Sequence, residues 1–261
     1  MKTTKSKDGT TLAYDVYGNG PPLIFVTGAT CFRQFEPVLQ DAKVFAEQFT
    51  VYNYDRRGRG DSTNTLPFSI EREMEDMEAM IDAAGGKANL YGHSSGAILA
   101  LEAGMRFGSK VSKLALYDPA YAHNQADLNE FEELSQELYT LLDRGKNDEA
   151  LSHFLEGIGT PKEVIDGMFR QSPQWAAMVA LAPTLAYDIM LASNLPPIAD
   201  ASRLTIPTHI MVGEESPASM HEVVKQLNDA IPHAEYSTLP GQDHMPDPNV
   251  VLQILTSFFK Q

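Results

Sequence analysis

Three residue types that cooperate in nucleophilic catalysis, a serine, an acid and a histidine, occur at separate places in this chain. Ser94 is at the centre of Gly92-His93-Ser94-Ser95-Gly96, which fits the pattern G-x-S-x-G. An apolar stretch precedes this pentapeptide, and a helix-forming run follows it. In that context the serine lies on a strained strand-to-helix turn that exposes its hydroxyl. The pattern predicts that Ser94 is a nucleophile and that the Ser95 N–H stabilises an oxyanion.

An acid and a histidine each follow another predicted strand. Asp118 comes directly after the apolar strand 111–117, and His244 lies in the loop after the strand 234–239. Because the carboxyl ends of parallel strands meet at one edge of a sheet, we expect both side chains to lie near Ser94. The histidine can then act as a general base, and a carboxylate can orient its imidazole.

The elements that must position these residues alternate between strands and helices. Short apolar or alternating runs predict further strands at 10–17, 23–26, 51–54, 89–91 and 208–213, and periodic runs predict helices at 32–48, 69–84, 97–107, 219–230 and 249–259. This alternation predicts a mostly parallel α/β sheet.

From 121 to 201 the pattern changes to helices without strands, predicted at 128–144, 148–158, 161–170 and 173–193. We interpret this segment as a helical cap, or lid, inserted into a core domain. The core domain then consists of residues 1–120 and 202–261.

Composition narrows the classes of partner. The 261 residues include 43% hydrophobic ones, enough for one full core, and the formal net charge is −15. That charge repels phosphate backbones and anionic membranes, so we expect no nucleic acid and no membrane as a partner. The single cysteine, Cys31, and an N-terminus without an apolar signal-peptide core favour a cytoplasmic location.

Cofactor signals are weak. The sequence contains no H-x-x-x-H pattern or Cys/His cluster, and no G-x-G-x-x-G follows a strand, so we expect neither a metal nor a dinucleotide cofactor. The basic, glycine-rich loop 55–62 is the exception in an acidic chain. We interpret it as a loop whose Asp and Arg side chains pair locally, rather than as a phosphate site.

The order of serine, acid and histidine, together with the turn around Ser94, resembles the α/β-hydrolase fold. Stretches similar to motifs of that family are 26–29, 55–62, 92–96 and 239–244. The resemblance covers nearly the whole chain. It implies an eight-stranded, mostly parallel sheet flanked by helices, with an inserted helical cap. It also implies Ser94 as nucleophile, His244 as general base and the Ala29 backbone N–H as the second oxyanion donor.

Two positions depart from the commonest pattern of this family. Ser216 stands where the acid usually lies, and Thr27 replaces a histidine before the glycine. Some members carry the acid one strand earlier, where this chain has Asp118, so we favour Asp118. Glu215 and Glu214 are the alternative acids. The Thr27 departure need not affect a donor that is a backbone N–H.

The predicted cap carries apolar side chains that we expect to form a roof over Ser94: Phe131, Tyr139, Phe154, Phe169, Trp175 and Met178. The residues expected to line the substrate pocket are Thr30, His93, Tyr121, Trp175 and Met178.

We therefore expect a small-molecule substrate: a small to medium uncharged ester, hydrolysed through an acyl-enzyme as in carboxylesterases. The alternatives are a ligand receptor or binding protein that keeps the fold, and a lyase or perhydrolase. The oligomeric state does not follow from the sequence.

Overall fold

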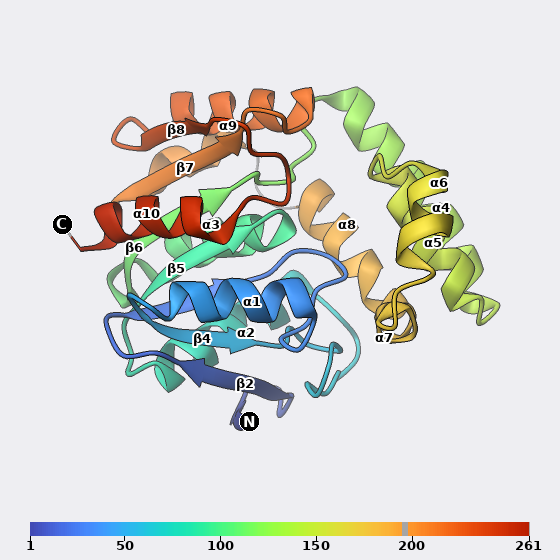
Figure 1. Cartoon of the computed structure of the whole chain (residues 1–261), viewed down its shortest axis with the longest axis horizontal. Helices are drawn as coiled ribbons and strands as arrows, with labels where there is room; N and C mark the ends of the chain where they lie inside the picture. Colours follow the sequence, from blue (N-terminus) through green and yellow to red (C-terminus); the bar gives the residue numbers. More distant parts are fainter. Residues whose placement is uncertain (195–197, 261) are drawn as a thin grey trace.

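The computed structural model describes residues 1–194 and 198–260 and contains an eight-stranded sheet with the order β1-β2-β4-β3-β5-β6-β7-β8 (Figure 1). The strands are Lys2–Lys5 (β1), Thr11–Tyr17 (β2), Pro22–Val26 (β3), Thr50–Tyr54 (β4), Ala88–His93 (β5), Val111–Tyr117 (β6), Thr208–Gly213 (β7) and Glu235–Leu239 (β8). β2 is antiparallel to both β1 and β4, and every other pairing is parallel. The predicted mostly parallel α/β sheet is confirmed.

Helices cover both faces of this sheet. α1 (Glu36–Phe45) and α10 (Pro248–Phe259) pack on one face, and α2 (Ile70–Ala83), α3 (Ser95–Phe107) and α9 (Ala218–Ala230) pack on the other (Figure 1). All six residues of β7 are buried as a result. Burial on both faces explains why the central strands are continuous apolar runs rather than alternating ones.

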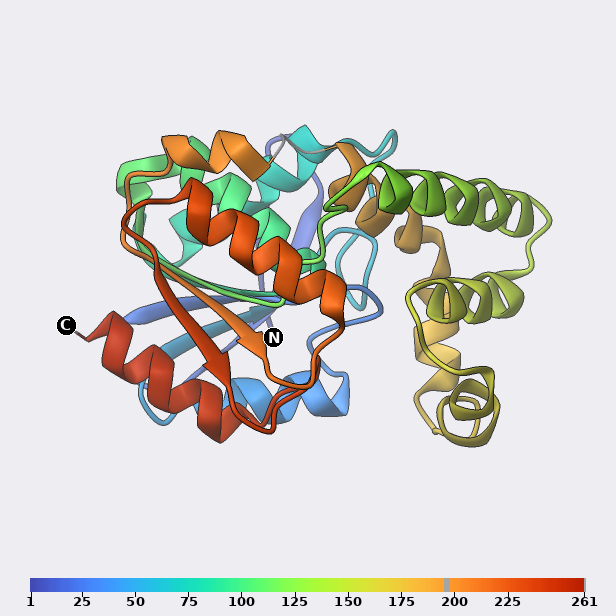
Figure 2. The same cartoon turned by 90° about the horizontal axis from the view of Figure 1, so that it is seen from above.

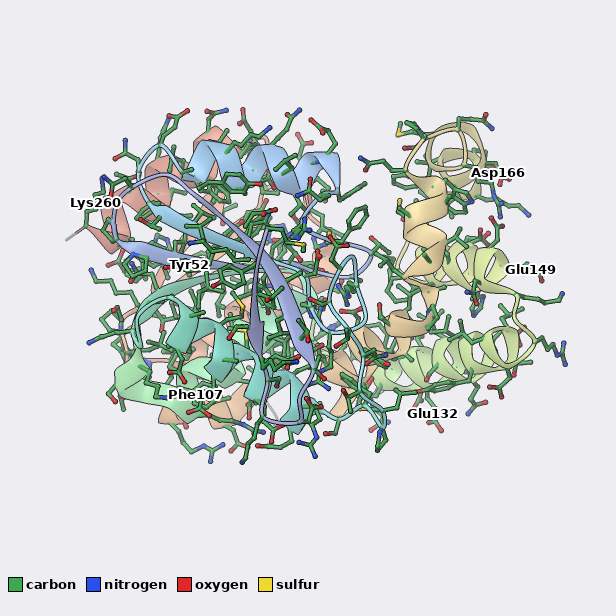
Figure 3. The ribbon with its side chains drawn as sticks, turned by 90° about the horizontal axis from the view of Figure 1, so that it is seen from below. Tyr52, Phe107, Glu132, Glu149, Asp166 and Lys260 are labelled. Carbon is green, nitrogen blue, oxygen red and sulfur yellow. The ribbon has the colours of Figure 1, made fainter. Side chains whose placement is uncertain are left out.

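The chain between β6 and β7, here called the helical segment, contains α4 (Gln125–Asp143), α5 (Asn147–Gly157), α6 (Lys162–Val164), α7 (Trp175–Ala180) and α8 (Leu185–Asn194). A π-helical turn, Ile165–Phe169, and 3₁₀ turns at Ala182–Thr184 and Ile198–Arg203 complete it. Figure 2 shows α4 to α7 projecting beyond the sheet. Glu132, Glu149 and Asp166 lie exposed on its outer surface (Figure 3).

The largest differences from the predicted elements have local causes. The prediction of a single helix over 173–193 was wrong, because the chain forms α7, a 3₁₀ turn and α8 there. Pro183 lies in that turn, and a proline removes a helical N–H and clashes with the preceding turn. The 32–48 helix is shorter than predicted, since α1 begins with a proline at its first turn. None of the helices in the described ranges has the length and apolarity needed to cross a bilayer.

Candidate active site

Ser94 lies at the turn from β5 into α3 and has a backbone conformation that residues other than glycine rarely adopt. Its φ and ψ are 58° and −127°. Its N–H donates to the Tyr117 carbonyl at 3.0 Å, which ties the turn to the end of β6. Strain of this kind costs about 1–3 kcal/mol and persists only where the surroundings enforce it. The fold therefore holds Ser94 at the carboxyl edge of the sheet, at the N-terminus of α3.

The glycines around this turn are required by close packing. A Cβ at Gly92 would lie 2.6 Å from the Ala97 Cα, and one at Gly96 would lie 2.1 Å from the Val26 carbonyl oxygen. A Cβ at Gly28, in the loop after β3, would lie 2.9 Å from the Ser94 Cβ. The loop after β3 therefore lies directly against Ser94.

Replacing Gly96 by alanine is expected to destabilise the fold by about 3 kcal/mol, because the new methyl group would overlap backbone that cannot rotate away. Urea unfolding followed by circular dichroism measures this change. Gly167→Ala is the matched control, since nothing lies within 4 Å of a Cβ at that position. Equal effects of the two substitutions would contradict the packing argument.

Asp118 and His244 meet at the same edge of the sheet. The His244 Nδ1 lies 2.9 Å from the Asp118 Oδ2. Asp118 is fully buried, while the His244 side chain is 34% exposed. Asp118 also accepts hydrogen bonds from the Ser216 hydroxyl at 2.6 Å and from the Gly213 N–H at 3.3 Å. The carboxylate is thus held rigidly, with one oxygen available to orient the imidazole.

The two alternative acids make other contacts. The Glu214 carboxylate accepts the Gly241 N–H at 2.9 Å, and the Glu215 N–H donates to the Gln242 carbonyl at 2.8 Å. Both side chains are exposed. In the part of the chain that the structure describes, the carboxylate bonded to His244 is that of Asp118.

The loop that carries His244 is hydrogen-bonded to the ends of two strands, β5 and β6. The His93 Nε2 donates to the His244 carbonyl at 2.7 Å, and the Tyr117 hydroxyl donates to the Asp243 carbonyl. The rings of His93 and His244 are 4.9 Å apart. Burial, reinforced by the positive charge that His244 can carry, lowers the pKa of His93 to about 4. His93 is therefore neutral near pH 7 and holds its neighbour in place.

The lowered pKa of His93 predicts an acid-dependent loss of stability. Below pH ~6.5 the unfolded chain binds a proton at this residue, whereas the folded chain binds it only when the pH falls to about 4. Between pH 7 and 4.5 His93 should therefore lower the free energy of unfolding by up to ~2 kcal/mol. Urea unfolding at both pH values should show a smaller pH dependence in His93→Asn, whose amide can still donate to the His244 carbonyl. An unchanged pH dependence would contradict this.

Two backbone N–H groups predicted as oxyanion donors lie near Ser94. Ser95 is the first residue of α3, where N–H groups have no partner within the helix. Ala29 follows Gly28 in the loop that touches Ser94, and its side chain packs against the apolar cluster of the helical segment. The next residue, Thr30, has a φ of 59°, so the loop turns sharply there.

The remaining predicted pocket and roof residues are less closely tied to Ser94. Tyr121 is buried in the core beneath the α2, α3 and α9 face of the sheet. Trp175 donates to Asp148 at 2.7 Å within the helical segment, and Met178 is buried in its cluster. Tyr139 is 45% exposed, and its place in a roof over Ser94 stays a prediction.

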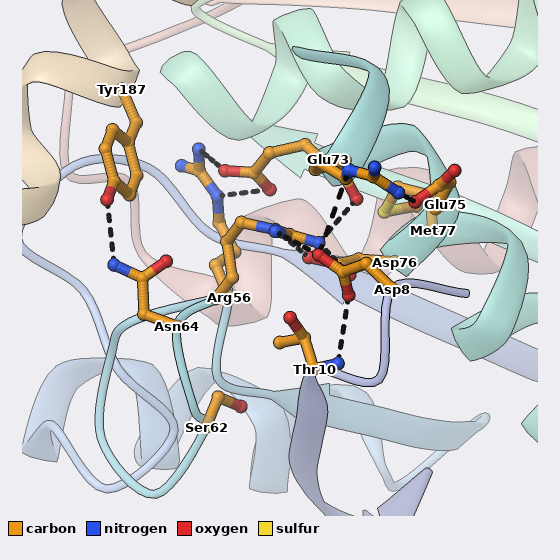
Figure 4. Close-up of polar contacts among 12 residues, drawn as sticks. Asp8, Thr10, Arg56, Ser62, Asn64, Glu73, Glu75, Asp76, Met77 and Tyr187 are labelled. Carbon is orange, nitrogen blue, oxygen red and sulfur yellow. Dashed lines mark hydrogen bonds and ion pairs between the residues drawn. The ribbon is translucent and has the colours of Figure 1, made fainter. Parts of the chain in front are cut away.

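The loop 55–62 departs most from expectation. The side chains of Arg56, Arg57 and Arg59 are at most 1% exposed. The prediction that charged side chains of this loop pair with each other was wrong for these three arginines, because their acidic partners lie outside the loop. Arg57 pairs with Asp76 and Asp8. Arg56 pairs with Glu73 of α2 (Figure 4).

Two arginines of this loop also pair with Asp188 of α8, which lies 2.7 Å from Arg56 and 2.6 Å from Arg59. No role for Asp188 was predicted from the sequence. The available signal was one acid inside the apolar run 185–192.

Within residues 1–194 and 198–260, no group of three or more His, Cys, Asp or Glu side chains is arranged to hold a metal ion. Cys31 is buried, and burial raises the pKa of its thiol to about 12. A thiol of that kind is a poor nucleophile, because the thiolate is the reactive form.

A model of the alpha/beta hydrolase family matches residues 9–252 of the chain. The chain belongs to the alpha/beta hydrolase family. A crystal structure of an alpha/beta hydrolase from Sphaerobacter thermophilus is 39% identical, with a TM-score of 0.86, and the alignment covers 99% of this chain and 100% of that one.

Two more distant similarities extend the comparison. The esterase RhEst1 from Rhodococcus is 20% identical, with a TM-score of 0.71 over 100% of this chain and 98% of its own, and it shares the fold. A protein named proline iminopeptidase PfmaB, from Pestalotiopsis fici, is 25% identical over 125 residues, which are 46% of this chain and 44% of that protein. The chain thus spans less than half the length of this relative.

Proposed function

We propose that this alpha/beta hydrolase is a serine hydrolase that cleaves small to medium uncharged esters. The observation that carries the proposal is the 2.9 Å contact between His244 and the buried Asp118, at the same sheet edge as the strained Ser94 turn. A nucleophile, a base and an orienting acid at one edge are the parts that acyl transfer requires.

The contacts suggest how the reaction proceeds. With the Nδ1 proton of His244 donated to Asp118, the Nε2 atom can accept the Ser94 proton as the Oγ atom attacks the ester carbonyl. His244 then protonates the leaving alcohol, which gives an acyl-enzyme. Water, activated by His244, hydrolyses this ester and restores Ser94. The N–H groups of Ser95 and Ala29 would stabilise the oxyanion in both steps.

The helical segment is proposed to cap this site and to favour apolar acyl groups. Its buried cluster includes Leu138, Phe154 and Leu185, and Ala29, Phe35 and Phe68 of the core pack against it. Tyr187 of α8 stacks on Phe68 with ring centres 3.7 Å apart, and its hydroxyl accepts from Asn64 at 2.8 Å (Figure 4). An apolar covering of this kind disfavours charged substrates. RhEst1 is named an esterase, which agrees with this proposal.

Labelling with a fluorophosphonate probe tests the proposal, because the probe reacts with an activated serine hydroxyl. We expect the purified protein to be labelled at Ser94, as located by peptide mass spectrometry, and to hydrolyse p-nitrophenyl acetate or butyrate. If the protein is not labelled and does not hydrolyse these esters, the proposal is overturned. That result would favour a ligand-binding protein with the same fold.

A further inference from the structure

A buried carboxylate of the helical segment contacts one side of the proposed oxyanion site directly, through Ser95, and is linked to the other side through Arg59. Asp188 is 2% exposed at its side chain, and its two oxygens pair with Arg56 and Arg59 of the core. Burial alone would raise its pKa, but Arg59 and Arg56 outweigh that effect and hold the pKa below the usual carboxyl range. Asp188 is therefore a fixed negative charge around which neighbouring donors are arranged.

Arg59 connects this charge to the loop after β3. Its Nη1 donates to the Gly28 carbonyl at 2.6 Å, while its Nη2 binds Asp188. The Gly28 carbonyl and the Ala29 N–H belong to one trans peptide, so they point in opposite directions. Holding the carbonyl toward Arg59 aims the Ala29 N–H away from it. A charged donor on the carbonyl also polarises the peptide and strengthens the N–H as a donor.

Ser95 connects the same charge to the start of α3. Its hydroxyl donates to the Asp188 Oδ1 at 2.7 Å and lies 3.5 Å from the Arg56 Nη1. This bond fixes the side chain of the residue whose backbone N–H is the other proposed donor. The Asp188 carboxylate of α8 thus connects two segments that follow different strands. It binds the first turn of α3 through Ser95 and the Gly28–Ala29 peptide through Arg59.

We propose that Asp188 and Arg59 are positioning residues that orient the two oxyanion donors, so that the oxyanion site is complete only when α8 is docked on the core. This inference rests on the proposed acyl-transfer function. It assigns a role in transition-state stabilisation to two residues that do not touch the reacting atoms.

Arg59→Lys, with Arg57→Lys as its matched control, tests the inference. Lysine keeps the positive charge but lacks the planar fork that binds Asp188 and the Gly28 carbonyl together. Arg57 is as buried as Arg59 and is also ion-paired, with Asp76 at 2.7 Å, but its bonds run to α2 and Asp8 instead of the oxyanion loop. Both substitutions should lower the melting temperature, so loss of stability alone does not separate them.

Kinetics and inhibitor binding separate the two variants. Arg59→Lys is expected to lower kcat for p-nitrophenyl butyrate by about 10- to 100-fold with KM changed by less than about threefold. The affinity for a trifluoromethyl ketone, whose hemiketal oxygen occupies the oxyanion site, should fall by the same factor as kcat. Arg57→Lys should keep both quantities within about threefold of the wild type.

Ser95→Ala gives a second test that leaves the ion pairs of Asp188 intact. It should lower kcat and trifluoromethyl ketone affinity by roughly tenfold, because the hydroxyl no longer anchors the first turn of α3 to the Asp188 carboxylate. If Arg59→Lys does not fold, Ser95→Ala decides, and an unchanged kcat overturns the inference. Equal losses in Arg59→Lys and Arg57→Lys also overturn it. If the wild type neither labels at Ser94 nor turns over esters, the proposed function itself fails, and the inference with it.

Discussion

Replacing Ser94 by alanine is expected to lower kcat for p-nitrophenyl ester hydrolysis by ~10⁶-fold. The reason is that the Oγ atom forms the covalent intermediate, and the remaining groups can only bind and polarise the ester. The substitution removes one oxygen from a half-buried side chain and keeps the backbone turn, so the melting temperature should change little. Steady-state kinetics and fluorophosphonate labelling of the same preparation measure both effects.

Ser152→Ala is a suitable control for this experiment. Ser152 lies in α5 of the helical segment and donates to the Asp148 carbonyl, away from the sheet edge that carries Ser94. It should retain wild-type labelling and turnover within about twofold. Retained turnover in Ser94→Ala would mean that another group attacks the substrate.

Replacing Asp118 by asparagine is expected to lower kcat by ~10⁴-fold, the second largest effect. An asparagine has nearly the same shape, but its amide can donate to the His244 Nδ1 and favour the tautomer whose Nε2 carries a proton. Such an imidazole cannot accept the Ser94 proton. KM should change little, because Asp118 is fully buried and does not face the substrate.

Glu215→Gln and Glu214→Gln are the comparisons for Asp118→Asn. Both residues follow β7, directly before Ser216, which stands at the family's commonest acid position, and both side chains are exposed. Each substitution should leave kcat within about threefold of the wild type. A loss of ~10⁴-fold in Glu215→Gln together with an active Asp118→Asn would move the acid to Glu215.

The fold could be predicted because its signals are local and agree with each other. The central strands are apolar on both faces, and Val111–Tyr117 was predicted with its observed bounds. The positions of Asp118 and His244 followed from strand ends, since parallel strands bring their carboxyl ends together whatever their separation in sequence. The exposed edge strand Lys2–Lys5 was missed, because its short polar sequence has no apolar alternation.

The pairing of the buried arginines could not be predicted in the same way. An arginine in a polar, glycine-rich loop is usually solvated, and a charge pair between Arg59 and Asp188 joins residues that no sequence periodicity relates. The hydroxyl of Ser216 is a similar case. Its sequence position indicated an absent acid, whereas the structure shows that it supports Asp118 by donating a hydrogen bond.

The contacts of α8 imply a limit on how far the helical segment can be exchanged or varied. Leu191 and Ala192 of α8 pack in the core cluster of the sheet, and Asp188 neutralises two buried arginines. Removing α8 would take away the ion pair between Arg59 and Asp188 and would leave Arg56 with Glu73 alone. Losing one partner of a buried pair costs about 3–5 kcal/mol. Swaps of α4 to α7 between relatives should therefore be tolerated more readily than swaps that include α8. The part of the helical segment that we expect to be exchangeable between relatives therefore ends before α8, at the turn that contains Pro183.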